Sequence, residues 1–327
     1  MKRIGITMGD SSGVGPEILL KAAHANRIPV PFVVYGDAVP LRKLNEQLAL
    51  GLPFHAVSSA ADCRDGAVNI VDLQMLTPQD LTPGQINAKS GQAAREYVIS
   101  ATKAALAGEI AAIVTLPMNK EATQLTDPGF TGHTELIGEL CGSNDVTIML
   151  ASPALIVTHV STHCSLRQAI ERCKKERIST IIDLTWHAVR RLKPGARIAV
   201  AGLNPHAGEN GLFGSEEIEE IRPAVEWARA QGYNVEGPLP PDTLFYMAVR
   251  RGQYDAVVCM YHDQGHIPSK LLDFEGGVNI ALGLPIVRTS VDHGTAFDIA
   301  WKGIASTASF EAAVDMAIRL AALDRPE

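Results

Sequence analysis

Three histidines stand directly after apolar runs that predict β-strands, namely His163 in VSTHCSLR, His206 in GLNPHAGE and His262 in YHDQGH. Open α/β sheets place their chemistry in the polar loops at strand ends. Neutral imidazole is the commonest metal ligand, and three protein ligands with one open position are typical of a catalytic metal site. A single loop histidine is more often a surface residue, so it is the repeated setting that favours a metal enzyme.

A second group of residues suits an anionic ligand. Arg288 lies in an apolar run, where an unpaired guanidinium would be costly, so it needs a structural carboxylate or an anionic group of a substrate. With Lys270 and Asn279 it would form an anion pocket in a chain that is acidic overall. Asp292 and His293 follow in the same glycine-flanked segment.

Two helix starts carry polar residues with two interpretations each. In TGHTELIGEL, Thr131 or Thr134 would cap a helix, or His133 and Thr134 would contact a substrate. In PPDTLF, Asp242 is either an N-cap or a carboxylate that faces the metal or the substrate.

Two further segments also have a structural and a functional interpretation. The run MGDSSGVGPE follows the first predicted strand and opens a helix, so its backbone N–H groups would hold an anion or form a plain β–α turn. Its spacing is neither GxGxxG nor that of a P-loop. The run YHDQGHIPSK is the densest polar segment after a predicted strand, and it favours function over packing.

Composition and charge fit a globular protein of 327 residues that is long enough for two domains. The chain is 46% hydrophobic and 20% charged, and its net charge of −7 argues against a general role on nucleic acid or membrane surfaces. No apolar run is long enough for a membrane span, and the first residues predict a strand rather than a signal peptide. Five scattered cysteines without a CxxC pair favour free thiols and a cytoplasmic location.

Short apolar runs alternate with helical patterns, which predicts an α/β fold with a mainly parallel sheet. The expected strands are 4–8, 32–35, 68–71, 111–115, 146–150, 155–158, 198–201, 256–260 and 286–289. The expected helices are 16–24, 39–48, 88–107, 135–141, 166–192, 216–231, 243–250, 295–301 and 310–323. The short connection between 146–150 and 155–158 predicts an antiparallel hairpin inside a second, inserted domain. We place the first domain at 1–125 plus 260–327 and the second at 126–259.

These motifs, in order and over nearly the whole chain, resemble the 4-hydroxythreonine-4-phosphate dehydrogenase (PdxA) family. The resemblance implies the isocitrate/isopropylmalate dehydrogenase-like fold, with two α/β domains flanking a cleft and no Rossmann domain. It also implies a homodimer, NAD or NADP as cofactor, and a divalent metal at the subunit interface. Three imidazoles would suit Zn, Ni or Co, whereas added substrate oxygens would suit Mg or Mn.

Carried over by motif, the resemblance makes His163, His206 and His262 the metal ligands, with His262 supplied by the partner subunit. It also assigns substrate contacts to a set of polar residues, namely His133, Thr134, Lys270, Asn279 and Arg288. Asp242 matches an aspartate that lies near the site in the family. The nicotinamide-binding residues stay unassigned.

One departure from the family pattern concerns the substrate. Biosynthetic members, which serve pyridoxine biosynthesis, continue after YHDQG with a leucine-proline run, whereas this chain has His266 followed by Ile267 and Pro268. That is similar to a paralogous branch that oxidises D-threonate or D-erythronate 4-phosphate. A dihydrodiol dehydrogenase of the same family also shares HDQGHIP, but it is less similar at GHTE, which favours a phosphorylated substrate here.

The expected reaction is a decarboxylating dehydrogenation of a four-carbon, 4-phosphorylated 3-hydroxy acid. Lys270, Asp242 and His266 are the candidates for proton transfer, and the sequence does not choose among them. A metal-dependent hydrolase or lyase without nicotinamide is the rival from another class.

Overall fold

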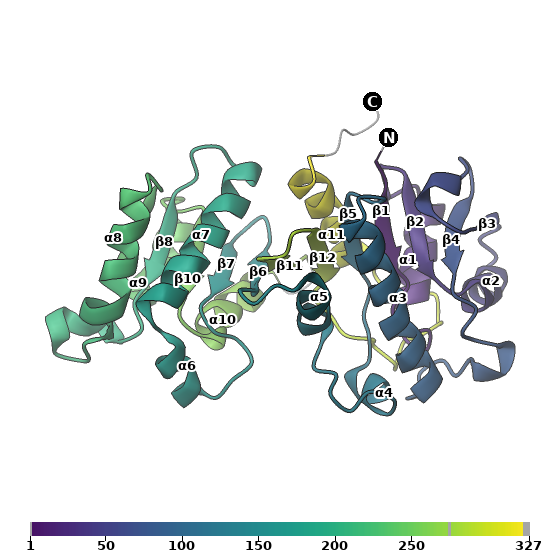
Figure 1. The fold of residues 1–327 in the computed structure, drawn as a ribbon, viewed down its shortest axis with the longest axis horizontal. Helices are drawn as coiled ribbons and strands as arrows, with labels where there is room; N and C mark the ends of the chain where they lie inside the picture. Colours follow the sequence, from purple (N-terminus) through teal and green to yellow (C-terminus); the bar gives the residue numbers. More distant parts are fainter. Residues whose placement is uncertain (1, 274–275, 323–327) are drawn as a thin grey trace. The chain divides into compact units, whose positions relative to one another are not determined.

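The computed structural model describes residues 2–273 and 276–322 and divides into two compact units. The first unit comprises Met1–Asn144 and Leu284–Glu327, and the second is the intervening segment Asp145–Gly283 (Figure 1). These boundaries differ from the expected ones, 1–125 plus 260–327 and 126–259. Residues 126–144 lie in the first unit because their helix packs on a long helix of that unit, and residues 260–283 lie in the second because they continue its sheet.

The first unit contains a parallel sheet in the order β3-β4-β2-β1-β5-β12. Its strands are β1 (Ile4–Thr7), β2 (Phe32–Gly36), β3 (Phe54–Val57), β4 (Val68–Asp72), β5 (Ala112–Thr115) and β12 (Val287–Val291). The central strands are buried along their length, which explains why they appear in the sequence as continuous apolar runs.

The helices of the first unit cover this sheet. Helix α3 packs across β1, β2 and β5, and α11 packs on β5 and β12 (Figure 1). The helices are α1 (Gly15–His24), α2 (Ala38–Gln47), α3 (Ala88–Leu106), α4 (Lys120–Gln124), α5 (His133–Cys141) and α11 (Ala308–Leu320). We expected the last helix to end at Leu323, which lies outside the described residues.

The second unit contains a mixed sheet in the order β11-β6-β7-β10-β8-β9. Its strands are β6 (Thr147–Ala151), β7 (Ile156–His159), β8 (Ile198–Ala201), β9 (Val235–Leu239), β10 (Ala256–Cys259) and β11 (Val278–Leu282). The predicted hairpin is confirmed, since β6 pairs antiparallel with β7. Strand β11 also runs antiparallel to β6, whereas β7, β10, β8 and β9 are parallel.

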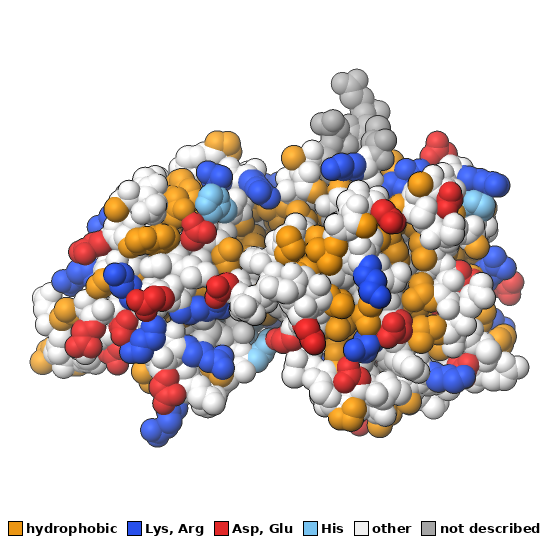
Figure 2. Space-filling model, viewed as in Figure 1, with side chains coloured by type: hydrophobic (Ala, Val, Ile, Leu, Met, Phe, Trp, Pro, Cys, Tyr) orange, Lys and Arg blue, Asp and Glu red, His pale blue; other side chains and the backbone are white. Residues whose placement is uncertain are grey.

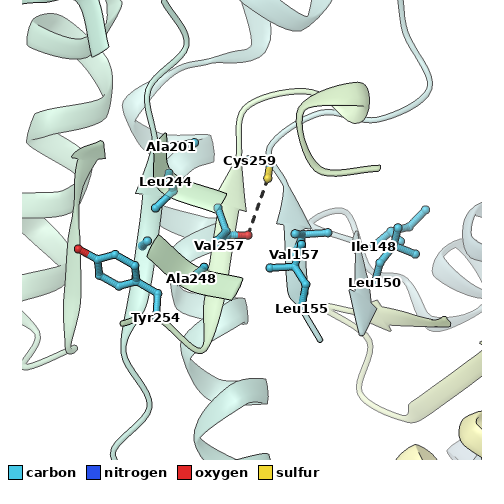
Figure 3. Packing of buried hydrophobic residues seen from close by; sticks show 11 residues of the cluster. Ile148, Leu150, Leu155, Val157, Ala201, Leu244, Ala248, Tyr254, Val257 and Cys259 are labelled. Carbon is cyan, nitrogen blue, oxygen red and sulfur yellow. Dashed lines mark hydrogen bonds between the residues drawn. The ribbon is translucent and has the colours of Figure 1, made fainter. Parts of the chain in front are cut away.

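The helices of the second unit are α6 (Leu166–Arg172), α7 (Lys175–Leu192), α8 (Arg222–Ala230), α9 (Pro241–Val249) and α10 (His262–Leu272). Helix α9 contributes Leu244 and Ala248 to a core that also holds Val157, Val257 and Cys259 of the sheet (Figure 3). Because side chains alternate along a strand, Thr158 points to the opposite face, where its hydroxyl lies 2.8 Å from that of Thr185 in α7.

Several sequence predictions about elements were wrong. Residues 295–301 do not form a helix, because Ala296 and Trp301 have positive φ and the Trp301 indole donates to the carbonyl of Ser11. The expected helix 166–192 is two helices that break at Cys173 and Lys174. The run after β10, expected to be a loop, is helix α10, and strands β3, β9 and β11 were missed.

The surface agrees with the composition. On the face seen in Figure 2, acidic and basic side chains are interspersed rather than gathered by sign. All five cysteines are free thiols. Within residues 2–273 and 276–322, no helix has the length and apolar character needed to cross a membrane.

Candidate functional site

The three histidines singled out above all belong to the second unit. His163 is exposed in the loop between β7 and α6, and His206 is exposed in a turn after β8. His262 is the first residue of α10, at the carboxyl end of β10. The rings of His163 and His262 are 5.8 Å apart between centroids.

A metal site requires several ligands to meet at one point. Within the described part of a single chain, no group of three His, Cys, Asp or Glu side chains is placed to hold a metal ion. The donor types suit a borderline cation, because imidazole nitrogens bind Zn, Co and Ni well. One chain therefore supplies suitable ligands without assembling a three-ligand site by itself.

Helix α10 carries the polar groups of the YHDQGHIPSK run. His262 and His266, one helical turn apart, are stacked with centroids 3.6 Å apart and rings inclined by 10°. His262 Nδ1 lies 2.6 Å from Asp263 Oδ1. Lys270 is a further turn along the helix, so the spacing of four places His262, His266 and Lys270 on one face.

The turn that carries His206 has an unusual backbone. Residues 206–210 all have left-handed conformations, with φ between 43° and 78°, although only Gly208 is a glycine. Such a run costs free energy and persists only where its surroundings impose it, often at functional sites.

Glu217, which was not singled out from the sequence, holds the backbone at the entry to this turn. Its buried side chain accepts hydrogen bonds from the backbone N–H groups of Leu203 and Asn204, both at 2.7 Å, and from the Asn204 amide at 3.0 Å. Asn204 also donates to Glu216 at 2.7 Å. The only indication in the sequence was a dense acidic run shortly after the histidine.

His159 and Gln264 were also missed. His159 ends β7, is fully buried, and its Nε2 lies 3.1 Å from Nδ1 of His266. Gln264 accepts from the N–H of Met260 and donates to the carbonyl of Gly202, both at 2.7 Å, so it ties α10 to the ends of two strands. Part of the HDQGH run is therefore explained by packing after all.

The first unit contains the predicted anion-binding residues Arg288, His133 and Thr134. Arg288 is buried on β12 and donates from Nε and Nη2 to the hydroxyl of Thr115, at 3.1 and 2.7 Å. Burial lowers the pKa of Arg288 to about 10, and the charge of Glu135 opposes this shift. The neighbouring side chain of Thr289 points to the opposite face, toward α11.

His133 is the first residue of α5. Burial, with the charges of Arg288 and Lys120, lowers its pKa to about 3, although a hydrogen bond with the backbone of Leu116 opposes this shift. Its Nε2 is buried, and no hydrogen-bond partner faces it among the described residues. Thr134 follows it, and neither Thr131 nor Thr134 caps the helix, because the N-cap is Gly132.

Asp242 and Asn279 are more simply placed, in the second unit. Asp242 is exposed in the first turn of α9, whose N-cap is Pro240, so Asp242 is not the cap. Asn279 lies in β11, opposite Leu150 of β6.

The glycine-rich turn after β1 is occupied by contacts within the protein. The N–H of Asp10 donates to the carbonyl of Pro117, and that of Val14 donates to the carbonyl of Thr295. The N–H of Ser12 donates to the side chain of Asp10, and that of Gly13 donates to the Asp10 carbonyl. A Cβ on Gly15 would lie 2.4 Å from the carbonyl of Met8. These contacts favour the plain β–α turn over an anion cradle.

A pocket of about 510 Å³ lies beside the buried His159 in the second unit, and Arg172, Lys174 and Arg177 are among its lining residues. Lys174 pairs with Glu220 at 2.8 Å, and Arg177 donates to the carbonyls of Val146 and Val160. Two of these three cations therefore hold the structure together.

Comparison with known proteins gives a consistent result. The family model described as pyridoxal phosphate biosynthetic protein PdxA matches residues 28–317. The D-threonate 4-phosphate dehydrogenase of Salmonella typhimurium is 45% identical over 327 residues, covering 98% of this chain and 99% of that protein. The 4-hydroxythreonine-4-phosphate dehydrogenase of Desulforapulum autotrophicum is 44% identical over 325 residues, covering 96% and 94%.

Solved structures agree. A crystal structure of 4-hydroxythreonine-4-phosphate dehydrogenase from Klebsiella pneumoniae aligns with a TM-score of 0.84 at 45% identity, covering 98% of this chain and 100% of that one. A β-decarboxylating dehydrogenase of Thermococcus kodakarensis aligns with a TM-score of 0.54 at 15% identity, covering 99% and 85%, a likeness of fold alone. The expected isocitrate/isopropylmalate dehydrogenase-like fold class is confirmed.

Replacing Glu217 with glutamine should weaken the turn that carries His206. The variant keeps the volume, and its amide oxygen can still accept from the N–H groups of Leu203 and Asn204, which share one carboxylate oxygen. Its amide nitrogen, however, faces the side-chain amide of Asn204, also a donor, and the charge on the acceptor is lost, so we expect a loss of about 1–3 kcal/mol in the free energy of unfolding. Urea unfolding measures it. Glu219→Gln, an exposed change in the same helical turn, is the control and should stay within about 0.5 kcal/mol. Equal stability of the two variants would contradict this role.

His133 should make stability depend on pH. Its pKa is about 3 in the folded protein and near 6.5 when unfolded, so the unfolded chain binds the extra proton between these values. Stability from this group is therefore complete above pH 6.5 and is lost as the pH falls. Relative to His133→Asn, the wild type should lose at most about 2 kcal/mol between pH 7.5 and 5. A difference in unfolding free energy that does not change with pH would contradict the assignment.

Proposed function

The chain belongs to the PdxA family and is an oxidoreductase, and from this premise we propose that it is an NAD- or NADP-dependent dehydrogenase of D-threonate or D-erythronate 4-phosphate. The reaction oxidises the secondary alcohol β to the carboxylate, after which the β-keto acid loses CO₂. The observation that carries this choice over 4-hydroxy-L-threonine 4-phosphate is the stack of His266 on His262. In this stack His266, which departs from the sequence pattern of the biosynthetic members, lies directly beside His262, a proposed metal ligand.

The phosphate is held in this proposal by His133, Thr134 and Arg288 of the first unit. Arg288 is oriented by Thr115, and a guanidinium binds phosphate oxygens through fixed, paired donors. The buried Nε2 of His133 provides a further hydrogen-bonding atom, which becomes a donor when a dianionic phosphate draws a proton onto the ring. Lys270 and Asn279 contact the rest of the substrate and orient it.

We propose that the protein is a homodimer and that His163 and His206 of one protomer hold a divalent cation together with the partner subunit's His262. The three imidazoles suit Zn, Co or Ni, and substrate oxygens would extend the choice to Mg or Mn. A cation bound there supplies Lewis acidity, which lowers the pKa of the substrate hydroxyl. The nicotinamide supplies the acceptor for the hydride.

The chain's own residues then handle orientation and protons. The substrate hydroxyl must give up a proton as the hydride leaves, and the carbon that loses CO₂ must gain one. Lys270 and His266 lie on one face of α10 with His262, whereas Asp242 lies on α9, and these are the candidates for the two transfers.

The test of the proposal is NADH or NADPH formation by the purified full-length protein with a divalent metal and NAD or NADP. D-Threonate and D-erythronate 4-phosphates are compared with 4-hydroxy-L-threonine 4-phosphate and with a cis-dihydrodiol. Turnover of a threonate-type substrate supports the proposal. Turnover of the amino substrate alone would assign the chain to pyridoxine biosynthesis, and turnover of the diol alone to the dihydrodiol branch. Metal-dependent hydrolysis or elimination without NADH would indicate the hydrolase or lyase.

His206→Ala should abolish metal binding and turnover while leaving the fold intact, because it removes one proposed ligand. His206→Asn is the companion variant, since asparagine tolerates the left-handed backbone and separates ligand loss from turn strain. His187→Ala, at a half-buried histidine of the same unit, is the control. Metal content, turnover and circular dichroism are the measurements, and full activity in both His206 variants would overturn the metal assignment.

If the metal site is shared between protomers, two inactive variants should complement each other in a mixed dimer. Co-expressed His206→Ala and His262→Ala chains form mixed dimers that contain one intact site, whereas each variant alone contains none. For random pairing we expect recovery of about a quarter of wild-type activity. No recovery in isolated mixed dimers would contradict a site built across the interface.

A further inference from the structure

His159 is a buried imidazole that the proposed reaction does not use. It ends β7, has no exposed surface, and its side chain lies on the face of the sheet that α10 covers. Burial, followed by the nearby His266, lowers its pKa to about 3, so the ring is neutral at physiological pH. A neutral imidazole has one N–H donor and one lone-pair acceptor, and its neighbours determine which nitrogen is which.

The neighbours of His159 determine its tautomer. Its Nδ1 lies 3.4 Å from the carbonyl oxygen of Ile148, which can only accept, so Nδ1 carries the proton. Its Nε2 is therefore an acceptor, 3.1 Å from Nδ1 of His266. The same His266 nitrogen lies 3.1 Å from the carbonyl oxygen of His262, a second acceptor. Both contacts require His266 to carry its proton on Nδ1.

We propose that His159 is a positioning residue, which accepts the Nδ1–H of His266 and thereby fixes the tautomer of that ring and its stack on His262. The consequence for the site rests on the function proposed above. When the ring is neutral, a proton on Nδ1 leaves Nε2 of His266 as the lone-pair nitrogen, which can accept a hydrogen bond or a proton from a substrate hydroxyl. His159 thus acts on the reaction through His266 without touching the substrate.

Gly265 supports this inference independently. A Cβ at this position would lie 2.5 Å from Nε2 of His159 and 3.0 Å from Sγ of Cys259. Its backbone is helical, so the requirement for glycine is a matter of space rather than of φ. Only glycine lets α10 lie close enough for His159 and His266 to meet.

The inference is tested with His159→Gln and His159→Leu. Glutamine can place an amide oxygen where Nε2 accepts, whereas leucine fills the space without an acceptor. If His159 only packed, the apolar leucine would be tolerated at least as well as glutamine, because the site is buried. If His159 positions His266, the glutamine variant should instead be the more active of the two. We then expect a loss of about 10- to 100-fold in kcat/KM for leucine and a smaller loss for glutamine.

The tautomer itself is measured by NMR of the ring nitrogens in ¹⁵N-histidine-labelled protein, with His266→Gln used for assignment. We expect an Nδ1–H ring at His266 in the wild type and in His159→Gln, and a weaker preference in His159→Leu, where the His262 carbonyl is the remaining acceptor. Gly265→Ala, with His159 unchanged, should disturb the same signals. A wild-type Nε2–H tautomer, or a His159→Leu signal identical to that of the wild type, would overturn the inference.

The two readouts separate the two proposals. If the wild type forms neither NADH nor NADPH with any substrate, the proposed function fails, and the ring signals still decide the role of His159. If the enzyme is active and the leucine variant equals or exceeds the glutamine variant in kcat/KM, the inference that His159 positions His266 fails while the proposed function stands.

Discussion

The close approach of α10 to the ends of β7 and β10 is the contact on which the second unit's candidate site depends. Gly265 permits it, since any Cβ would meet His159 and Cys259. Gln264 fixes it, because its amide joins the backbone of Met260 to that of Gly202. His262, His266 and Lys270 then lie on one face of the seated helix. A residue without a side chain and a buried amide therefore set the position of three groups that can do chemistry.

The two units hold their candidate groups by different means. In the first, a buried guanidinium is oriented by a threonine hydroxyl, and an imidazole is kept neutral by burial. In the second, Glu217 accepts hydrogen bonds from the backbone where the chain enters the strained turn of His206. In both, the groups that position a functional side chain are buried and polar, and such groups are costly unless their hydrogen bonds are satisfied.

The sequence predicted the features of the fold that depend on composition and on the spacing of apolar residues. The α/β class, the β6–β7 hairpin and most elements followed from apolar runs and helical spacing. Helix α10 was missed because Gly265 and Pro268 disfavour a helix locally, and packing overrode that preference. Strand β9 was missed because Gly237 and Pro238 interrupt a short edge strand. The roles of His159, Glu217 and Gln264 could not be read from their local sequence, since their partners lie up to about a hundred residues away.

The order in which the chain is made bears on its folding, because the first unit is discontinuous and the second is not. Strand β12, which pairs with β5, emerges from the ribosome only after residue 283. Until then β5 has an unpaired edge, and such edges are prone to pair with other chains. The second unit has all of its residues by that point, so the usual order, in which the N-terminal unit finishes first, is reversed here. The sheet that still lacks β12 is the stage at which a chaperone would be most useful.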